Sequence, residues 1–300
     1  MIDSKLLTLV TLAEKKSFTR TSKALNLTQP AVSHHISQLE AELGVQLVVR
    51  NNTQIVFTEE GKIAVEYAKK ILGLYDKMST EVKDSKHHTT NLKIGITHTS
   101  ESSIIMMVLA KVSTMTPKMN ITVNTDTIKN LYDKLDNFEI DLAIIDEKVN
   151  LEKYNSLLLN TDSLVCILSK ENKLSKKPVL TLEDLKNERM ILRLKDSATR
   201  MQFDSALISM NQSIDDFDVI LEVDNISTIK SLVSKNLGIS ILARNACISD
   251  IRKGKIVAIP IENLSMIRET NIIYNKNNDY SQVVSSIYKT YQETTRAKSH

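Results

Sequence analysis

Tryptophan is absent from this 300-residue chain, and cysteine is nearly so, with only Cys166 and Cys247. The two cysteines stand far apart and among apolar residues, a setting that favours buried, unpaired thiols over a redox pair. No cysteine or histidine has metal-ligand spacing, and His87 and His88 fall in a polar stretch. We therefore expect neither a metal nor a cofactor.

Long apolar runs are also missing. No stretch approaches the ~20 consecutive apolar residues that cross a bilayer, and the N-terminus carries Asp3 and Lys5 inside an amphipathic helix. The chain has no Gly-rich phosphate loop, nucleophile elbow or acid-base pair at a recognisable spacing. These absences predict a cytoplasmic protein with no membrane partner and no enzymatic activity.

The most specific pattern that is present lies in residues 18–50, which predict two short helices joined by a tight turn. Asn26 and Leu27 make the bend, and Thr28 offers a side-chain oxygen to the free amides of the second helix. Pro30 falls in the first turn of that helix, where its missing N–H costs nothing and its fixed φ is suitable. The length and mass of the chain, 33.8 kDa, allow about two domains in all.

The second helix has one apolar face and one polar face. The apolar positions predict a single inward stripe: Val32, Ile36, Leu39 and Leu43. The outward positions are Gln29, Pro30, Ser33, His34 and Ser37. Amides, hydroxyls and imidazoles of this kind can read base edges in the major groove of DNA. The alternative is the solvated polar face of an ordinary helix pair, because such hairpins are common in all-α domains.

A longer pattern surrounds these helices: Phe18, Ala24, Leu27-Thr28-Gln29-Pro30-Ala31-Val32-Ser33, Ile36, Leu39-Glu40, Leu43-Gly44, Leu47, Arg50 and Thr58-x-x-Gly61. It resembles the N-terminal domain of the LysR-type transcriptional regulators. The resemblance implies a winged helix-turn-helix domain over residues 1–58, with the helix-turn-helix at about 18–37 and a β-ribbon wing from about Val48 to Phe57. Its partner would be double-stranded promoter DNA. By this resemblance the residues at the DNA are Thr28, Gln29, Pro30, Ser33, His34, Ser37 and Arg50.

Two positions depart from the family pattern. His34 stands where the family usually has arginine, so a phosphate or guanine contact could be weaker or sensitive to pH. Val48 stands where the family has phenylalanine, which concerns packing under the wing. We expect His34 to contact DNA and the neighbouring His35 to be an exposed imidazole.

The charge of the chain is consistent with sequence-selective binding. Its formal net charge is +3, and residues 1–58 hold six basic and four acidic side chains. A protein that coats nucleic acid without preference is normally far more basic. The weak charge suits a dimer that reads DNA with two heads through shape and base contacts.

Residues 59–88 predict one long helix, capped by Thr58 and begun by two glutamates. Apolar residues recur along it as in a coiled coil about three heptads long: Ile63, Tyr67, Ile71, Leu74, Met78 and Val82. An ordinary core-facing stripe is the alternative. Because the segment has no evident core of its own to cover, we expect Ile63, Tyr67, Ile71, Leu74 and Met78 to form a dimer interface. A dimer predicts a pseudo-palindromic target, and the family resemblance implies tetramers and contact with RNA polymerase.

Beyond residue 91, short β-rich runs alternate twice with amphipathic helices. This order predicts a two-lobed α/β effector domain over residues 89–300 with mainly parallel central strands. Lobe I would comprise about 91–161 and 266–300, and lobe II about 162–265, with a hinge near 161–162 and 264–265. The resemblance implies a layout like that of the periplasmic binding proteins.

Ligands of open α/β sheets bind at the carboxyl ends of strands. The polar residues that follow these strands are the expected effector contacts: Thr99, Ser100, Ser102, Asp146, Arg193, Lys195 and Asn225. Hydroxyls near a helix start, opposite cations, point to a small anionic metabolite such as a carboxylate. Helix capping and surface solvation of these side chains are the alternatives.

Two other functions fit parts of the chain. Prephenate dehydratase resembles the two-lobed layout, and Thr199-Arg200 is a near miss for its Thr-Arg-Phe motif. A small-molecule binding module alone leaves the first sixty residues unexplained. We therefore predict a regulator in which an effector between the lobes changes the placement of the DNA-binding heads.

Overall fold

Residues 3–51, 54–101, 104–149 and 152–299 are described by a computed structural model. The chain divides into two units, of which one comprises residues 1–89 with 136–139 and the other comprises 90–135 with 140–300. None of the described helices combines the length and the apolar character needed to span a membrane.

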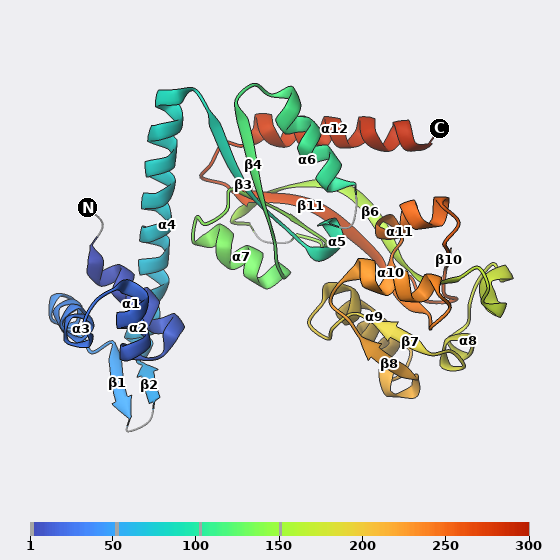
Figure 1. The fold of residues 1–300 in the computed structure, drawn as a ribbon, viewed down its shortest axis with the longest axis horizontal. Helices are drawn as coiled ribbons and strands as arrows, with labels where there is room; N and C mark the ends of the chain where they lie inside the picture. Colours follow the sequence, from blue (N-terminus) through green and yellow to red (C-terminus); the bar gives the residue numbers. More distant parts are fainter. Residues whose placement is uncertain (1–2, 52–53, 102–103, 150–151, 300) are drawn as a thin grey trace. The chain divides into compact units, whose positions relative to one another are not determined.

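The N-terminal unit contains α1 (Ser4–Lys15), α2 (Phe18–Leu25) and α3 (Gln29–Leu43) (Figure 1). Asn26 ends α2 in the left-handed conformation with φ 54°, and the Thr28 hydroxyl oxygen accepts from the Ala31 amide at 3.3 Å. Val32, Ile36 and Leu39 are buried in the core of this unit. The inward prediction for Leu43 is wrong: it lies in the last turn, next to the helix-ending Gly44, and is 52% exposed.

The expected wing is present as an antiparallel pair, β1 (Val48–Asn51) and β2 (Gln54–Phe57). Glu40 anchors its base, because one carboxylate oxygen accepts from the backbone amides of Leu47 and Val48 at 2.8 and 3.1 Å. Val48 is buried. The substitution of valine for the family's phenylalanine therefore affects packing beneath the wing.

The long helix α4 (Glu59–His87) begins at Thr58, whose hydroxyl oxygen accepts from the Gly61 amide at 2.9 Å. Glycine is required at position 61 because α4 passes close to the backbone of Leu47, and a Cβ at this position would collide with the Leu47 carbonyl oxygen. The helix ends at His88, with φ 52°. It therefore runs into the stretch that the sequence suggests is a polar linker.

Lobe I of the second unit is built on β3 (Thr90–Ile96), β4 (Met119–Thr125) and β5 (Leu142–Ile145), which are parallel. α6 (Ile105–Met115) and α12 (Ser281–Ser299) pack on one face of this sheet. α7 (Ile128–Asp136) covers the other face (Figure 1). A short helix, α5 (His98–Glu101), follows β3 directly.

Lobe II has its own core. Its helices and strands are η1 (Lys173–Lys176), α8 (Leu182–Lys186), β7 (Met190–Leu192), α9 (Ala198–Ser209), η2 (Ile214–Asp216), β8 (Val219–Glu222), α10 (Ile226–Ser234), β9 (Ser240–Ala243), α11 (Arg244–Arg252) and β10 (Ile256–Ile259). The β7–β8 pair is parallel, but β9 and β10 both pair antiparallel with β6. The expectation of mainly parallel strands therefore holds for the centre of lobe I and is wrong for this part of lobe II.

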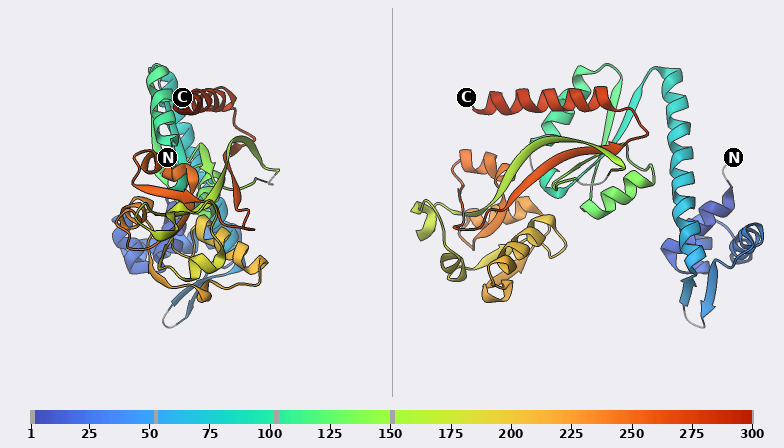
Figure 2. Two further views of the ribbon diagram at one scale, coloured as in Figure 1. Left: turned by 90° about the vertical axis from the view of Figure 1, so that its right-hand side faces the viewer. Right: turned by 180° about the vertical axis from the view of Figure 1, so that it is seen from behind.

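A two-stranded ribbon joins the lobes. It consists of β6 (Tyr154–Ser169) and β11 (Ile267–Asn275), paired antiparallel with Arg268 opposite Asp162 (Figures 1 and 2). Leu159 of β6 lies in the core of lobe I, whereas Leu164 lies in the core of lobe II. The ribbon therefore crosses between the lobes at about Asp162, where the sequence predicts one of the hinge segments.

Candidate functional sites

The polar face of α3 is open to solvent. Thr28, Gln29, Pro30, His34 and Ser37 are exposed, and Ser33 is half-buried. The Gln29 amide oxygen accepts from the Thr19 hydroxyl of α2 at 3.3 Å. This bond uses the amide oxygen of Gln29 and ties its side chain to α2.

The two histidines of α3 have different surroundings. His34 is exposed, but the expectation of an exposed His35 is wrong, because its Nδ1 lies 2.8 Å from the hydroxyl of the buried Thr8. Thr8 already donates its one hydroxyl hydrogen to the Ser4 carbonyl at 2.8 Å. His35 Nδ1 is therefore the donor, and the imidazole joins α3 to α1.

The wing contributes one expected DNA-binding position. Arg50 lies in β1 with its backbone paired to that of Ile55 in β2. This hairpin is the position at which the family resemblance places a contact to the DNA backbone.

The apolar stripe on α4 is exposed. Ile63, Tyr67 and Ile71 are 57%, 61% and 49% exposed, and Leu74 and Met78 are 52% and 50% exposed. Such a row of large apolar side chains on one helix is typical of a protein interface. The geometry fits the predicted dimerisation seam.

The second unit contains a cavity of about 210 Å³. It is bounded by the start of lobe I's first helices, the β6–β11 ribbon, α11 and α12. Three of the expected effector residues line it: Thr99, Ser100 and Asp146. Other polar lining residues include Asp162, Arg252 and Tyr291, which the sequence patterns do not single out.

Asp146 is the most constrained of these residues. It is buried, and it accepts hydrogen bonds from the hydroxyls of Thr97, of Ser100 at 3.2 Å and of Thr270 at 2.9 Å. Its carboxylate also lies 2.8 Å from the guanidinium of Arg268. Ser100, one of the hydroxyls expected to meet an anion, therefore donates to a carboxylate of the protein itself.

Asp162 lies on the same wall of the cavity. Its oxygens accept from the backbone amides of Ser163 at 2.8 Å and Asn245 at 3.0 Å. Burial raises the pKa of Asp162 despite these bonds. Burial, with added repulsion from Asp162 and Asp146, also raises the pKa of Tyr291 to about 12.

Arg193 and Arg268 are both buried, at 3% and 5% exposure. Arg193 donates from Nη2 to Asp224 at 3.0 Å, and Arg268 donates from Nη1 to Thr199 at 3.4 Å. The Nε and Nη1 of Arg193 and the Nε of Arg268 have no hydrogen-bond partner within the described part of the chain. Burial lowers the pKa of Arg193, and the positive charge of Arg268 acts in the same direction.

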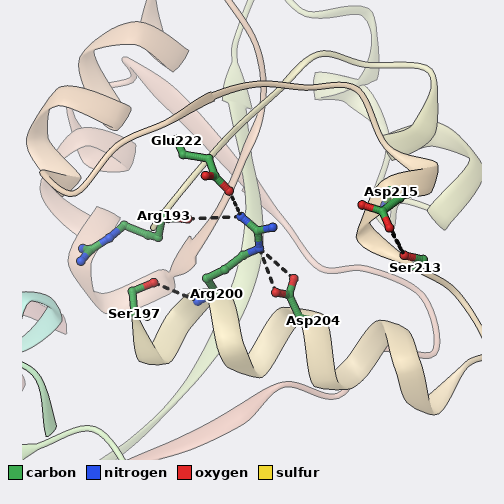
Figure 3. Close-up of polar contacts among 7 residues, drawn as sticks. All are labelled: Arg193, Ser197, Arg200, Asp204, Ser213, Asp215 and Glu222. Carbon is green, nitrogen blue, oxygen red and sulfur yellow. Dashed lines mark hydrogen bonds and ion pairs between the residues drawn. The ribbon is translucent and has the colours of Figure 1, made fainter. Parts of the chain in front are cut away.

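Arg200 holds the backbone beside Arg193 in place (Figure 3). Its Nε donates to Asp204 at 2.8 and 3.0 Å, and its Nη1 donates to Glu222 at 2.7 Å and to the Arg193 carbonyl at 3.4 Å. Figure 3 shows the Arg193 side chain pointing away from this cluster. Arg200 is thus a structural residue of lobe II that positions the strand end carrying Arg193.

The remaining expected effector residues lie elsewhere. Lys195 is exposed, and Asn225 caps α10 by accepting from the Thr228 amide at 2.9 Å. Ser102 lies outside the described residues. Arg268, Asp162 and Tyr291 were missed, although a charged residue within a β-rich run, as at 162 and 268, is a usable signal for a site.

The cysteines and the acidic clusters suggest no further chemistry. Cys166 and Cys247 are buried, as expected, and burial raises the pKa of both thiols. Over the described ranges, no group of three or more His, Cys, Asp or Glu side chains is arranged to hold a metal ion.

Two family models match this chain. The one described as "Bacterial regulatory helix-turn-helix protein, lysR family" matches residues 4–62, and "LysR substrate binding domain" matches residues 85–295. A "Probable RuBisCO transcriptional regulator" of Thalassiosira pseudonana is 27% identical over 283 residues, 92% of each chain. The regulator CysL of Bacillus subtilis (strain 168) is 25% identical over 269 residues, 89% of each chain.

Solved structures share the fold. CbnR, a LysR family transcriptional regulator, gives a TM-score of 0.67 at 16% identity, over 98% of this chain and 99% of that one. The regulatory domain of Synechocystis PCC6803 CcmR in complex with 2-PG gives 0.59 at 19% identity, over 69% of this chain and 98% of that domain.

Proposed function

This chain belongs to the LysR family of bacterial transcriptional regulators, and we propose that it binds promoter DNA as a dimer under the control of a small anion. The anion site that we propose is built on Arg193 and Arg268. One observation carries the proposal: both guanidinium groups are buried, yet they keep N–H donors that no described residue accepts.

An anion would remove two costs at this site. Each unpaired buried donor costs roughly 1–3 kcal/mol, and the two positive charges repel each other. Carboxylate and phosphate groups match the planar donor fork of arginine, which gives them preference over a spherical ion. The regulatory domain of CcmR, which shares this fold, forms a complex with 2-PG, a small anionic metabolite, and this supports the same ligand class here.

Titration calorimetry on the full chain tests this site with 2-PG and, as a neutral probe, glycerol. We expect 2-PG to bind and Arg193→Gln to weaken that binding at least tenfold, since about 1.4 kcal/mol corresponds to a factor of ten. Lys195→Gln is the matched control, because Lys195 is an exposed cation two residues away. Equal effects of the two substitutions, or none from Arg193→Gln, would remove the basis of the proposal.

We further propose that the polar face of α3 reads the major groove. Its exposure supports this role, as does the Thr19 contact that orients the Gln29 amide. In a gel-shift assay with the gene's own upstream DNA, Gln29→Ala is expected to weaken specific binding by about tenfold to a hundredfold. Gln38→Ala, an exposed glutamine of the same helix outside the proposed set, is expected to have no effect.

The α4 stripe supports pairing of two chains in this proposal. The two helix-turn-helix domains of the dimer then bind two DNA half-sites separated by about one helical turn or a multiple of it. Association into tetramers, contact with RNA polymerase and action in the cytoplasm follow from the family argument and belong to the same proposal. An effector held between the lobes would act by changing the bend of the β6–β11 ribbon.

The enzyme alternative receives no support from its one motif. Arg200, the arginine of the Thr-Arg dipeptide, is 3% exposed and engaged with Asp204 and Glu222. It is therefore not available to bind a substrate. The relatives reported above are named as transcriptional regulators.

A further inference from the structure

The cavity of about 210 Å³ is separate in its chemistry from the arginine site. Neither Arg193 nor Arg268 lines it, and neither does Thr199, the hydroxyl partner of Arg268. Asp146 and Asp162 connect the two places, because both line the cavity, Asp146 pairs with Arg268, and Asp162 lies opposite Arg268 in the ribbon. The cavity thus lies on the carboxylate side of the Arg268–Asp146 ion pair.

Two carboxylates face this cavity, and only one has a cationic partner. Asp146 is neutralised by Arg268. Asp162 accepts from two backbone amides but forms no ion pair with any residue that the structure describes. An amide dipole does not cancel a full negative charge. Burial raises the pKa of Asp162, although the charge of Arg268, opposite it in the ribbon, acts to lower that pKa. Asp162 is therefore the position on the wall that can form an ion pair with a positively charged guest.

Tyr291 of α12 gives an independent indication of a ligand. Its side chain is 7% exposed and lines the cavity. Its hydroxyl forms no hydrogen bond to a residue within the described ranges, although both Asp146 and Asp162 are close enough to influence it. The ring of Tyr291 is buried, but its hydroxyl oxygen is not among the fully buried polar atoms without a partner, so the hydroxyl is open to the cavity and can bond to a molecule held there. An acceptor-rich cavity with an unused hydroxyl is suited to a guest that donates hydrogen bonds.

The rest of the lining limits the shape of the guest. Ile104, Ile105 and Ile248 supply apolar surface. The volume holds on the order of fifteen water-sized groups, so a ligand of that size or smaller fits. The exposed Arg252 of α11 also lines the cavity and brings positive charge to it.

We propose that this cavity is a second ligand site that takes a protonated primary amine on a compact apolar body. The ammonium group donates to Asp162 and to the oxygen of Tyr291, and the apolar body packs against the three isoleucines. The ammonium group has three donors, which match the acceptors available here. An anion in the same place would meet the carboxylate of Asp162, so the ligand class is opposite in charge to that of the arginine site.

The amine could be a simple alkylamine or an amino acid, and three small probes separate these sources. L-valine carries both charged groups, isobutylamine lacks the carboxylate, and isovalerate lacks the ammonium. All three share the same branched apolar body. Titration calorimetry on the full chain is expected to show binding of isobutylamine and no binding of isovalerate. Tighter binding of L-valine than of isobutylamine identifies an amino acid, with Arg252 facing its carboxylate, and the reverse identifies a simple amine.

Two substitutions test the residues. Asp162→Asn is expected to weaken isobutylamine binding more than tenfold, because a charge-assisted hydrogen bond is lost. Tyr291→Phe is expected to weaken it about tenfold, because the hydrogen bond from the charged ammonium group to the tyrosine oxygen is lost. Tyr288→Phe is the matched control, since Tyr288 lies one turn away on α12 and does not line the cavity. If the Asp162→Asn variant does not fold, the Tyr291→Phe variant alone tests the amine site.

The proposal is overturned if neither amine binds at millimolar concentration to protein with a native circular dichroism spectrum. It is also overturned if isovalerate binds as well as isobutylamine, or if Tyr291→Phe and Tyr288→Phe act alike. Arg193→Gln separates this site from the anion site, because it is expected to leave isobutylamine binding unchanged. Failure of the amine proposal would therefore not affect the proposals that α3 binds DNA and that Arg193 and Arg268 bind an anion.

Discussion

The ion pair between Arg268 and Asp146 is a point at which one substitution has a calculable effect on stability. Both side chains are 3% exposed, and Nη2 and Oδ2 lie 2.8 Å apart. Three hydroxyl groups also donate to the Asp146 carboxylate. Asp146→Asn keeps the size of the side chain but leaves Arg268 without an anionic partner and replaces an acceptor by a donor.

The expected loss of stability is large. Removing one partner of a buried ion pair costs about 3–5 kcal/mol, because the other charge stays buried. In a domain of 150–250 residues each 1 kcal/mol lowers Tm by roughly 2–4 °C. We therefore expect Asp146→Asn to lower the Tm of the effector unit by about 10 °C. Far-UV circular dichroism measures this, since the chain has no tryptophan for fluorescence.

A partly exposed aspartate provides the control. Asp126 pairs with Lys134 at 2.7 Å, but its side chain is 23% exposed, and such pairs contribute about 0–1 kcal/mol. Asp126→Asn is expected to change Tm by only a few degrees. Adding Arg268→Met to Asp146→Asn is expected to recover part of the loss by removing the uncompensated charge. A loss below about 1 kcal/mol, or a double variant worse than the single one, would refute the charge-balance reasoning.

Three further predictions concern the helices and the thiols. Leu74→Asp puts a charge on the exposed α4 stripe and is expected to shift sedimentation toward the monomer, whereas Lys62→Ala, at an exposed position off the stripe, is not; unchanged sedimentation of Leu74→Asp would contradict the interface. His34→Arg is expected to tighten DNA binding. It adds one phosphate contact per chain, so for the dimer the slope of log K against log salt concentration should become steeper by about 1.8; an unchanged slope would mean that position 34 does not meet a phosphate. Burial raises the pKa of Cys247 from 9.0 to about 12, so the folded state favours the neutral thiol. The contribution of the buried Cys247 thiol to stability is complete below pH 9 and is lost as the pH rises toward 12. At pH 8 we expect the native protein to resist alkylation by iodoacetamide until denaturant is added. Rapid labelling of the native protein would contradict this.

Local signals in the sequence predict the helix-turn-helix well. Thr28 caps α3 and the 3.6-residue spacing of Val32, Ile36 and Leu39 matches their burial, because capping and periodicity act over one or two turns. Leu43 has the same spacing but no tertiary neighbour to cover it. His35 likewise depends on Thr8, 27 residues away in sequence, whose position the local pattern does not contain.

The β6–β11 ribbon and the ligand sites depend on contacts between segments that lie far apart in the sequence, and local signals do not predict such contacts. The first half of β6 is only partly buried and carries Asn155, Asn160 and Thr161, so its strand character depends on pairing with β11, more than a hundred residues later. Arg193 could be predicted because it follows a short apolar strand. Arg268 offers only the weaker signal of a charge within a β-rich run, and Tyr291 offers none, since each becomes part of a site only when distant segments meet at Asp146 and Asp162.

The Arg268–Asp146 pair also determines how the two proposed ligands would influence each other. An anion near Arg193 and Arg268 competes with Asp146 for the Arg268 guanidinium, and a weakened pair leaves more negative charge on the cavity side. An ammonium group beside Asp162 would then bind more tightly. Because coupling between two binding equilibria is reciprocal, the amine must raise the affinity for the anion by the same factor. The arrangement of charges therefore predicts positive cooperativity between ligands of opposite sign, with Arg268 and Asp146 as the shared contacts.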